Sequence, residues 1–187
     1  MEQEEQKVLH IPDVKIFGGW NGLQKFLKSK GNPPYTLGGS LILDFGEITN
    51  LGNLISVEGD LRLSNSQIES LGTLQTVSGN LDLENSKLKS LGNLTSVGGV
   101  LDLYGTNIKS LGNLQTVGDY LDLRETKIKS LGNLSSVVGS LDLRKTPIKS
   151  LGILTSVGGD LDLRKRSEEH TSELQSHLNL VCRLLLE

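Results

Sequence analysis

Cysteine, histidine and aromatic residues are scarce in this chain. Phe, Tyr and Trp together make 4% of the 187 residues, and Cys182 is the single cysteine. Up to residue 165 there is no cysteine and one histidine, His10. The scarcity gives no support to a disulfide framework or a structural zinc site. It also leaves no pair of residues from which a cysteine–histidine or serine–histidine catalytic centre is readily built.

Long apolar runs and a strong charge bias are also missing. No stretch approaches the length that crosses a bilayer, and the polar, acidic start MEQEEQKVLH lacks the apolar core of a signal peptide. Residues 1–165 hold 17 basic and 18 acidic side chains, so the net charge is near zero. We therefore expect a cytoplasmic protein, with a virion component or an injected effector as alternatives, and neither membrane nor nucleic acid as a partner.

A 20-residue unit dominates what is present. It repeats six times in register from Leu41 to Asp160, and a seventh copy begins at Leu161. If the first Leu is position 1, then positions 1, 3, 8, 11, 14 and 17 are apolar in all six copies. A fixed period of this size predicts a solenoid, in which neighbouring coils bury a continuous apolar ladder that no coil could bury alone.

The positions within the unit predict its local structure. Leu at positions 1 and 3 predicts a short strand whose position 2 points outward. The spacing of three between positions 8, 11, 14 and 17 favours 3₁₀ or extended returns over a long α-helix. Glycine at position 12 disfavours a helix, and the glycine at position 19 is expected to supply a turn with positive φ. The fold class predicted is a mainly β repeat solenoid with one parallel sheet.

The repeat resembles the leucine-rich repeat, whose signature L-x-x-L-x-L-x-x-N-x-L aligns with residues 98–108. Leu101, Leu103 and Ile108 match it, whereas Gly98 and Thr106 depart from it. The stretch L-x-x-L-x-x-V-x-G-x-L-x-L at residues 131–143 is also similar to receptor L domains. These resemblances imply a right-handed coil, and short units with this Thr resemble repeat proteins of bacteria and phages.

Three segments are expected. Residues 1–37 do not repeat and are predicted to form an N-terminal cap with a short helix, in which Asn21 is the N-cap and Gly31 the stop. Residues 38–165 are the solenoid. Residues 166–187, RSEEHTSELQSHLNLVCRLLLE, resemble the conceptual translation of an indexed sequencing adapter, and we interpret them as an artefact that replaces further repeats.

Positions 2 and 4 of the unit are the predicted binding surface, because exposed strand residues often bind partners in solenoids of this type. Asp82, Glu84 and Asp102 form an acidic stretch beside Tyr104, which is the expected hot spot. In later coils Arg124 and Arg144 stand beside Asp122 and Asp142 and can neutralise them. The alternative is a solvated face that only keeps the sheet soluble.

Other columns carry weaker functional signals. The Asp column lies between buried leucines rather than in a glycine-rich turn, so no metal is expected, and no cofactor is expected either. The lysines at position 9 are interpreted as a solvated face. The Ser or Thr at position 6 and the Asn at position 13 are interpreted as structural residues that bond to turns and backbone groups, and the serines at position 10 have no catalytic base within their repeats. Without a catalytic constellation, we expect a non-enzymatic, monomeric protein-interaction module with a protein partner. The alternatives are a structural spacer of a phage particle or surface protein, and the targeting arm of a larger effector.

Overall fold

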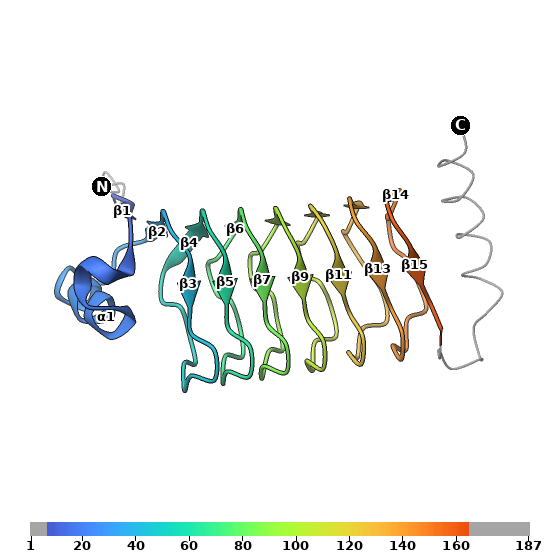
Figure 1. Cartoon of the computed structure of the whole chain (residues 1–187), viewed down its shortest axis with the longest axis horizontal. Coiled ribbons are helices and arrows are strands. Elements are labelled where there is room, and N and C mark those ends of the chain that lie inside the picture. The colour runs from blue at the N-terminus through green and yellow to red at the C-terminus, as the bar shows by residue number, and fades with distance from the viewer. Residues whose placement is uncertain (1–6, 165–187) are drawn as a thin grey trace, which may run out of the picture.

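The chain forms an elongated stack of coils, as the computed structural model of residues 7–164 shows (Figure 1). Coil 1 spans residues 41–60, each following coil adds 20 residues, and coil 7 begins at Leu161. Every coil contributes short strands that pair in parallel with the same positions of the next coil; Leu101 pairs with Leu121, for example. The fold class predicted, a mainly β parallel-sheet solenoid with a single short helix, is confirmed.

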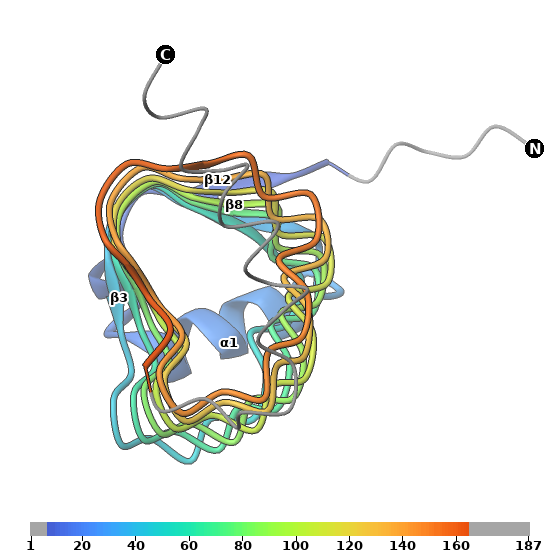
Figure 2. The same cartoon turned by 90° about the vertical axis from the view of Figure 1, so that its right-hand side faces the viewer.

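The strands belong to two sheets that line different sides of the coil (Figure 2). Sheet A contains β1 (Leu9–Ile11), β2 (Tyr35–Leu37), β4 (Leu54–Val57), β6 (Thr76–Val77), β8 (Ser96–Val97), β10 (Thr116–Val117), β12 (Ser136–Val137) and β14 (Ser156–Val157). Sheet B contains β3 (Leu41–Ile42), β5 (Leu61–Arg62), β7 (Leu81–Asp82), β9 (Leu101–Asp102), β11 (Leu121–Asp122), β13 (Leu141–Asp142) and β15 (Leu161–Asp162).

Sheet A corrects the prediction of one parallel sheet. Positions 16 and 17 carry Thr or Ser followed by the β-branched Val, and this pair is extended in every described coil from coil 2 onward. The backbone N–H of Gln75 donates to the carbonyl of Ile55 at 2.8 Å, and Gly98 N–H donates to the Val77 carbonyl at the same distance. The apolar spacing of three concealed this strand, because two residues are too few to show an alternation.

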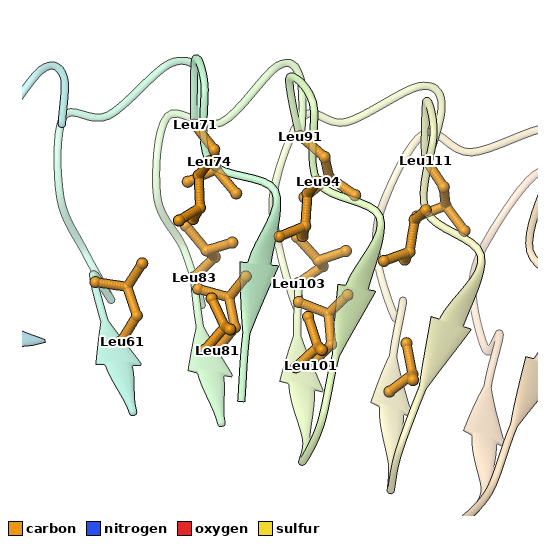
Figure 3. Packing of buried hydrophobic residues seen from close by; sticks show 14 of the residues in the cluster. Leu61, Leu71, Leu74, Leu81, Leu83, Leu91, Leu94, Leu101, Leu103 and Leu111 are labelled. Carbon is orange, nitrogen blue, oxygen red and sulfur yellow. The ribbon is translucent and has the colours of Figure 1, made fainter. Parts of the chain in front are cut away.

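The core is the ladder that the repeat predicts. The side chains at positions 1, 3, 8, 11, 14 and 17 are buried in coils 2 to 6, each at most 6% exposed. Leu71 and Leu74 from one side of the coil meet Leu81 and Leu83 near sheet B (Figure 3). Neighbouring coils repeat this layer, so each leucine packs against its equivalents above and below. Stability is therefore a sum over interfaces between coils.

The glycines serve different purposes from those expected. The position-12 glycines, such as Gly72 with φ 59°, adopt the left-handed conformation in a turn that the Leu74 N–H to Leu71 carbonyl bond closes at 3.2 Å. The prediction of positive φ at position 19 is wrong. A Cβ on Gly79 would lie 2.8 Å from the backbone carbon of Gly59, so position 19 is kept small by close stacking of the coils.

The N-terminal cap continues sheet A at one end of the stack. β1 pairs with β2, which pairs with β4 of coil 1. The 3₁₀-helix η1 (Val14–Phe17) and the helix α1 (Trp20–Ser29) come between β1 and β2 in the chain. Helix α1 buries Leu23 and Leu27 against the first coil. Gly31 has the predicted positive φ of 80° after the helix. The N-cap is Gly19 rather than Asn21, which lies inside the helix. The interpretation of residues 166–187 falls outside the described residues.

Candidate binding surface on sheet B

The structure brings all eight predicted site residues onto the outer side of sheet B. Asp82, Asp102, Asp122 and Asp142 stand at position 2, at the ends of β7, β9, β11 and β13. Glu84, Tyr104, Arg124 and Arg144 stand at position 4, in the turn that follows each of these strands. Because Leu at positions 1 and 3 points inward, positions 2 and 4 share the outer face. Equivalent residues of neighbouring coils are therefore stacked roughly 4.8 Å apart.

An Asp–Arg ladder runs along coils 5 to 7. The Arg124 guanidinium donates to the Asp122 carboxylate from Nε at 2.8 Å and from Nη2 at 2.5 Å. Arg144 repeats this geometry on Asp142, and Arg164 repeats it on Asp162. Arg124 and Arg144 also approach the carboxylate of the next coil, since Arg124 Nε lies 3.6 Å from Asp142 Oδ2 and Arg144 Nε lies 3.4 Å from Asp162 Oδ2. The ladder fixes side chains that would otherwise be free to rotate.

Burial of the ladder carboxylates was not predicted. Asp122 is 0% and Asp142 is 4% exposed, whereas position 2 was expected to face solvent. The arginines cover them from one side and Tyr120 from the other, where its hydroxyl donates to Asp142 Oδ2 at 3.1 Å. Burial alone would raise the pKa of Asp142, but the hydrogen bonds from Arg144 and Tyr120 hold that pKa below its ordinary value.

Tyr120 is the residue that the sequence reasoning missed. It stands at position 20, two residues before Asp122, and the two-residue alternation of a strand places positions 20, 2 and 4 on one face. The alternation of leucines in the repeat begins at position 1. Position 20 precedes it and varies in residue type from coil to coil, so the pattern gives no signal there. Burial, followed by the negative charges of Asp122 and Asp142, raises the pKa of the Tyr120 hydroxyl, which therefore remains a proton donor.

Coils 3 and 4 are the acidic part of the face. One carboxylate oxygen from each of Asp82, Glu84 and Asp102 lies within 4.8 Å of the others. Burial, followed by repulsion from neighbouring carboxylates including Asp82 and Glu84, raises the pKa of Asp102 to about 6. Arg62 balances this charge only in part, because its Nε lies 3.8 Å from Asp82 Oδ2 while its Nη2 binds Asp44 at 3.0 Å.

This acidic group has the spacing of metal ligands, but one oxygen of each aspartate already accepts a backbone N–H. Asp82 Oδ1 accepts the N–H of Glu84 at 3.1 Å, and Asp102 Oδ1 accepts the N–H of Tyr104 at 2.9 Å. These bonds close the turn after each strand. The cluster is therefore explained by local turn geometry, and exposed acidic groups often lie this close without a metal.

Tyr104 marks the boundary between the acidic and the basic coils. The guanidinium carbon of Arg124 lies 5.0 Å from the centre of the Tyr104 ring, which is a cation–π contact. The ring is therefore half-buried rather than fully exposed. From Tyr104 a groove of about 360 Å³ extends over coils 5 to 7, lined by Arg124, Arg144, Arg164 and by Lys145 with its ion-pair partner Glu125.

The side chains of the Ser, Thr and Asn columns bond to the backbone only in part, as predicted for positions 6 and 13, because the buried hydroxyls of Ser66 and Ser86 at position 6 have no hydrogen-bond partner among residues 7–164. At position 6, the Thr106 hydroxyl donates to the Leu103 carbonyl at 2.8 Å within the same turn. At position 10, the Ser90 hydroxyl accepts the N–H of Gly92 at 3.0 Å. At position 13, the side-chain amide of Asn133 donates to the Gly112 carbonyl of the preceding coil at 3.2 Å. These contacts give the columns a structural explanation.

The fold and this face define a tandem-repeat protein of the parallel β-solenoid class. Comparison with protein-family models, with curated proteins and with solved structures finds no match to the chain. Within residues 7–164, no helix is long and apolar enough to cross a membrane. The surface chemistry of the solenoid therefore has to carry the functional argument.

Proposed function

We propose that this chain is a non-enzymatic protein-interaction module that binds a protein partner through the outer face of sheet B. The observation that carries the proposal is the ordered Asp–Arg ladder beside the Tyr104 groove. Binding normally costs the entropy of fixing long side chains at the interface. Here the arginines are already held by two bonds each, so this cost is reduced before a partner arrives.

The chemistry of the face indicates which groups a partner would present. Arg124 and Arg144 use Nε and Nη2 on their own carboxylates, and the rest of each guanidinium faces the groove. Carboxylates or carbonyl oxygens of a partner fit these donors. Over coils 3 and 4, the group of Asp82, Glu84 and Asp102 fits a lysine or arginine. Tyr104, between the two parts, supplies an aromatic anchor of the kind that dominates interface energies.

A selection from a displayed library of folded small domains tests this proposal. The full chain is immobilised, clones are enriched on it, and each clone is then measured against Tyr104→Ala and Gln115→Ala. Gln115 is exposed outside sheet B, so its truncation leaves the proposed surface intact. We expect most enriched clones to lose at least tenfold in affinity on Tyr104→Ala and to be unchanged on Gln115→Ala. Each clone is also measured against a further variant, Arg144→Ala. If the affinity of the clones is unchanged on both Tyr104→Ala and Arg144→Ala, the assignment of this face is refuted.

We further infer that the repeat is a short relative of the leucine-rich and L-domain type from a bacterium or phage. In its support, the stretch V-x-G-x-L-x-L spans the strands of both sheets, with Val137 in β12 and Leu141 in β13. The two strands therefore follow from one short motif. Genome context of the gene is the measurement that checks the proposed origin.

The adapter interpretation of residues 166–187 is a proposal that sequencing decides. The gene is amplified from its source DNA and read through codon 165. Continuation of coil 7 as an LDLRKT-like repeat would support the interpretation. If RSEEHTSELQ persists in independent template, the segment is part of the protein and the interpretation is wrong.

A further inference from the structure

Coil 1 departs from the repeat on its outer surface. At position 2 it carries Ile42, which is 61% exposed, where the later coils carry a charged residue. At position 5 it carries Phe45, which is 78% exposed and has φ 56°. Coils 2 and 3 place Asn65 and Asn85 in the same left-handed conformation, which asparagine tolerates far better than phenylalanine does. Folding gains little from either apolar side chain, so their exposure calls for another explanation.

The inner surface of coil 1 is also incompletely covered. Leu43 and Ile48, at positions 3 and 8, are only partly buried, whereas their equivalents in coils 2 to 6 are at most 2% exposed. The reason lies in the cap, which extends sheet A through β1 and β2 but leaves β3 as the edge strand of sheet B. A groove of about 660 Å³ results, with Trp20 of α1 on one side and Ile42, Leu43 and Ile48 on the other.

The charged residues that line this groove are both acidic. Asp44 is paired with Arg62 at 3.0 Å, whereas Glu47 is exposed and forms no ion pair with any of the described residues. The groove combines the apolar side chains of Trp20, Leu43 and Ile48 with an acidic rim, and this combination complements an apolar side chain with a neighbouring cation. The chain's own first six residues, MEQEEQ, hold three glutamates and are repelled by the same rim. They are therefore a poor occupant.

We propose that the groove between the cap and coil 1 binds a short extended segment of a partner protein, which carries a large aliphatic or aromatic side chain beside a lysine or arginine. The apolar side chain enters between Trp20 and Ile48, and the cation meets Glu47. Phe45, which stands between the lining residues Asp44 and Gly46, extends the apolar contact beyond the groove. The site is separate from the face of coils 3 to 7, so the inference does not rest on the function proposed above.

Trp20 supplies the measurement, because it is the only tryptophan of the chain and lines the groove. The full chain is titrated with the peptide acetyl-Lys-Leu-Phe-Lys-amide, and its fluorescence is followed with excitation of tryptophan alone. The matched probe is acetyl-Glu-Leu-Phe-Glu-amide. We expect a saturable shift of the emission maximum with the basic peptide and at least tenfold weaker binding of the acidic one. An absent or non-saturating response, or equal binding of both peptides, would overturn the proposal.

The repeat itself provides variants that preserve the fold. Phe45→Asn introduces the residue of Asn65 and Asn85, and Glu47→Lys introduces the residue that coil 3 carries as Lys87. We expect Phe45→Asn to lower the affinity for the basic peptide at least tenfold. We expect Glu47→Lys to reduce or reverse the preference for the basic peptide over the acidic one. If both variants bind like the unmodified chain, the groove is not the site.

Two controls separate the remaining outcomes. Tyr104→Ala is expected to leave peptide binding unchanged, and a loss there would place the peptide on sheet B rather than in the groove. Sedimentation velocity over a range of concentrations examines self-association. A dimer that forms with the unmodified chain and disappears with Phe45→Asn would make a second copy the occupant and overturn the proposed partner.

Discussion

Removal of a ladder arginine should cost far more in the middle of the solenoid than at its last described coil. Arg124 covers Asp122, whose side chain is 1% exposed, so Arg124→Ala leaves a carboxylate with little access to water. Breaking a fully buried ion pair costs about 3–5 kcal/mol. The Arg124 side chain is itself 37% exposed, and its loss admits water, so we expect a decrease of about 2–3 kcal/mol in the free energy of unfolding.

Arg164→Ala is the matched control, because it removes the same contact from the same repeat position. The side chains of Arg164 and Asp162 are 74% and 20% exposed, so the pair is close to an ordinary surface ion pair. We expect a loss of about 0–1 kcal/mol. Urea unfolding of the full chain, followed by circular dichroism, measures both variants. With a slope near 2 kcal/mol/M, Arg124→Ala should lower the midpoint by about 1 M.

A third variant isolates the charge as the cause. Asp122→Asn combined with Arg124→Ala removes the uncompensated carboxylate while retaining an oxygen that accepts the backbone N–H of residue 124. The double variant should recover more than half of the stability that Arg124→Ala loses. Equal losses for Arg124→Ala and Arg164→Ala, or no recovery in the double variant, would refute the reasoning from burial.

Three other substitutions, the last with a matched control, address the acidic coils, coil 1 and the core. The pKa of Asp102 is about 6 in the folded protein, above its ordinary value of 3.8. The ionised carboxylate is therefore disfavoured by folding, and the free energy of unfolding decreases as the pH rises from 3.8 to about 6. Asp102→Asn should therefore increase the free energy of unfolding, measured with urea at pH 7, by on the order of 1 kcal/mol after allowance for solvent, and show no such gain below about pH 4. Phe45→Asn should stabilise by about 0.5–1 kcal/mol in thermal unfolding, since it relieves a left-handed phenylalanine; an unchanged or lower Tm would contradict this. Leu111→Asp should abolish the cooperative transition, whereas Gln115→Asp should change stability by less than about 0.5 kcal/mol.

The core was predictable because the same pattern of apolar positions occurs in all six copies of the repeat. Any one copy leaves it open whether Leu111 or Gln115 faces inward. Position 11 is apolar in all six copies, whereas position 15 is polar in five of them and apolar only at Ile55, and this comparison decides the matter. The parallel stacking followed from the same argument, since a coil with six apolar side chains needs neighbours on both sides.

The details that were not predicted depend on contacts between coils. A sequence shows that Asp122 alternates with leucines, but not that Tyr120 and Arg124 close over it and exclude water. In the same way, Gly79 is required because the backbone of the preceding coil, at Gly59, lies against it. The residues next to Gly79 in the sequence give no indication of this contact. The second sheet was missed for a related reason, since strands of two residues are defined by their partners and not by a pattern of their own.

The hydrogen bonds of both sheets run along the axis of the stack, and this direction determines how the protein responds to force. A pull on the two ends loads these bonds one coil at a time, in an unzipping geometry, because each coil is held only by its neighbours. Every coil that detaches releases 20 residues, or about 65–70 Å of chain. The solenoid should therefore lengthen in equal steps at low and similar forces, and act as an extensible tether whose reach is set by the number of its repeats.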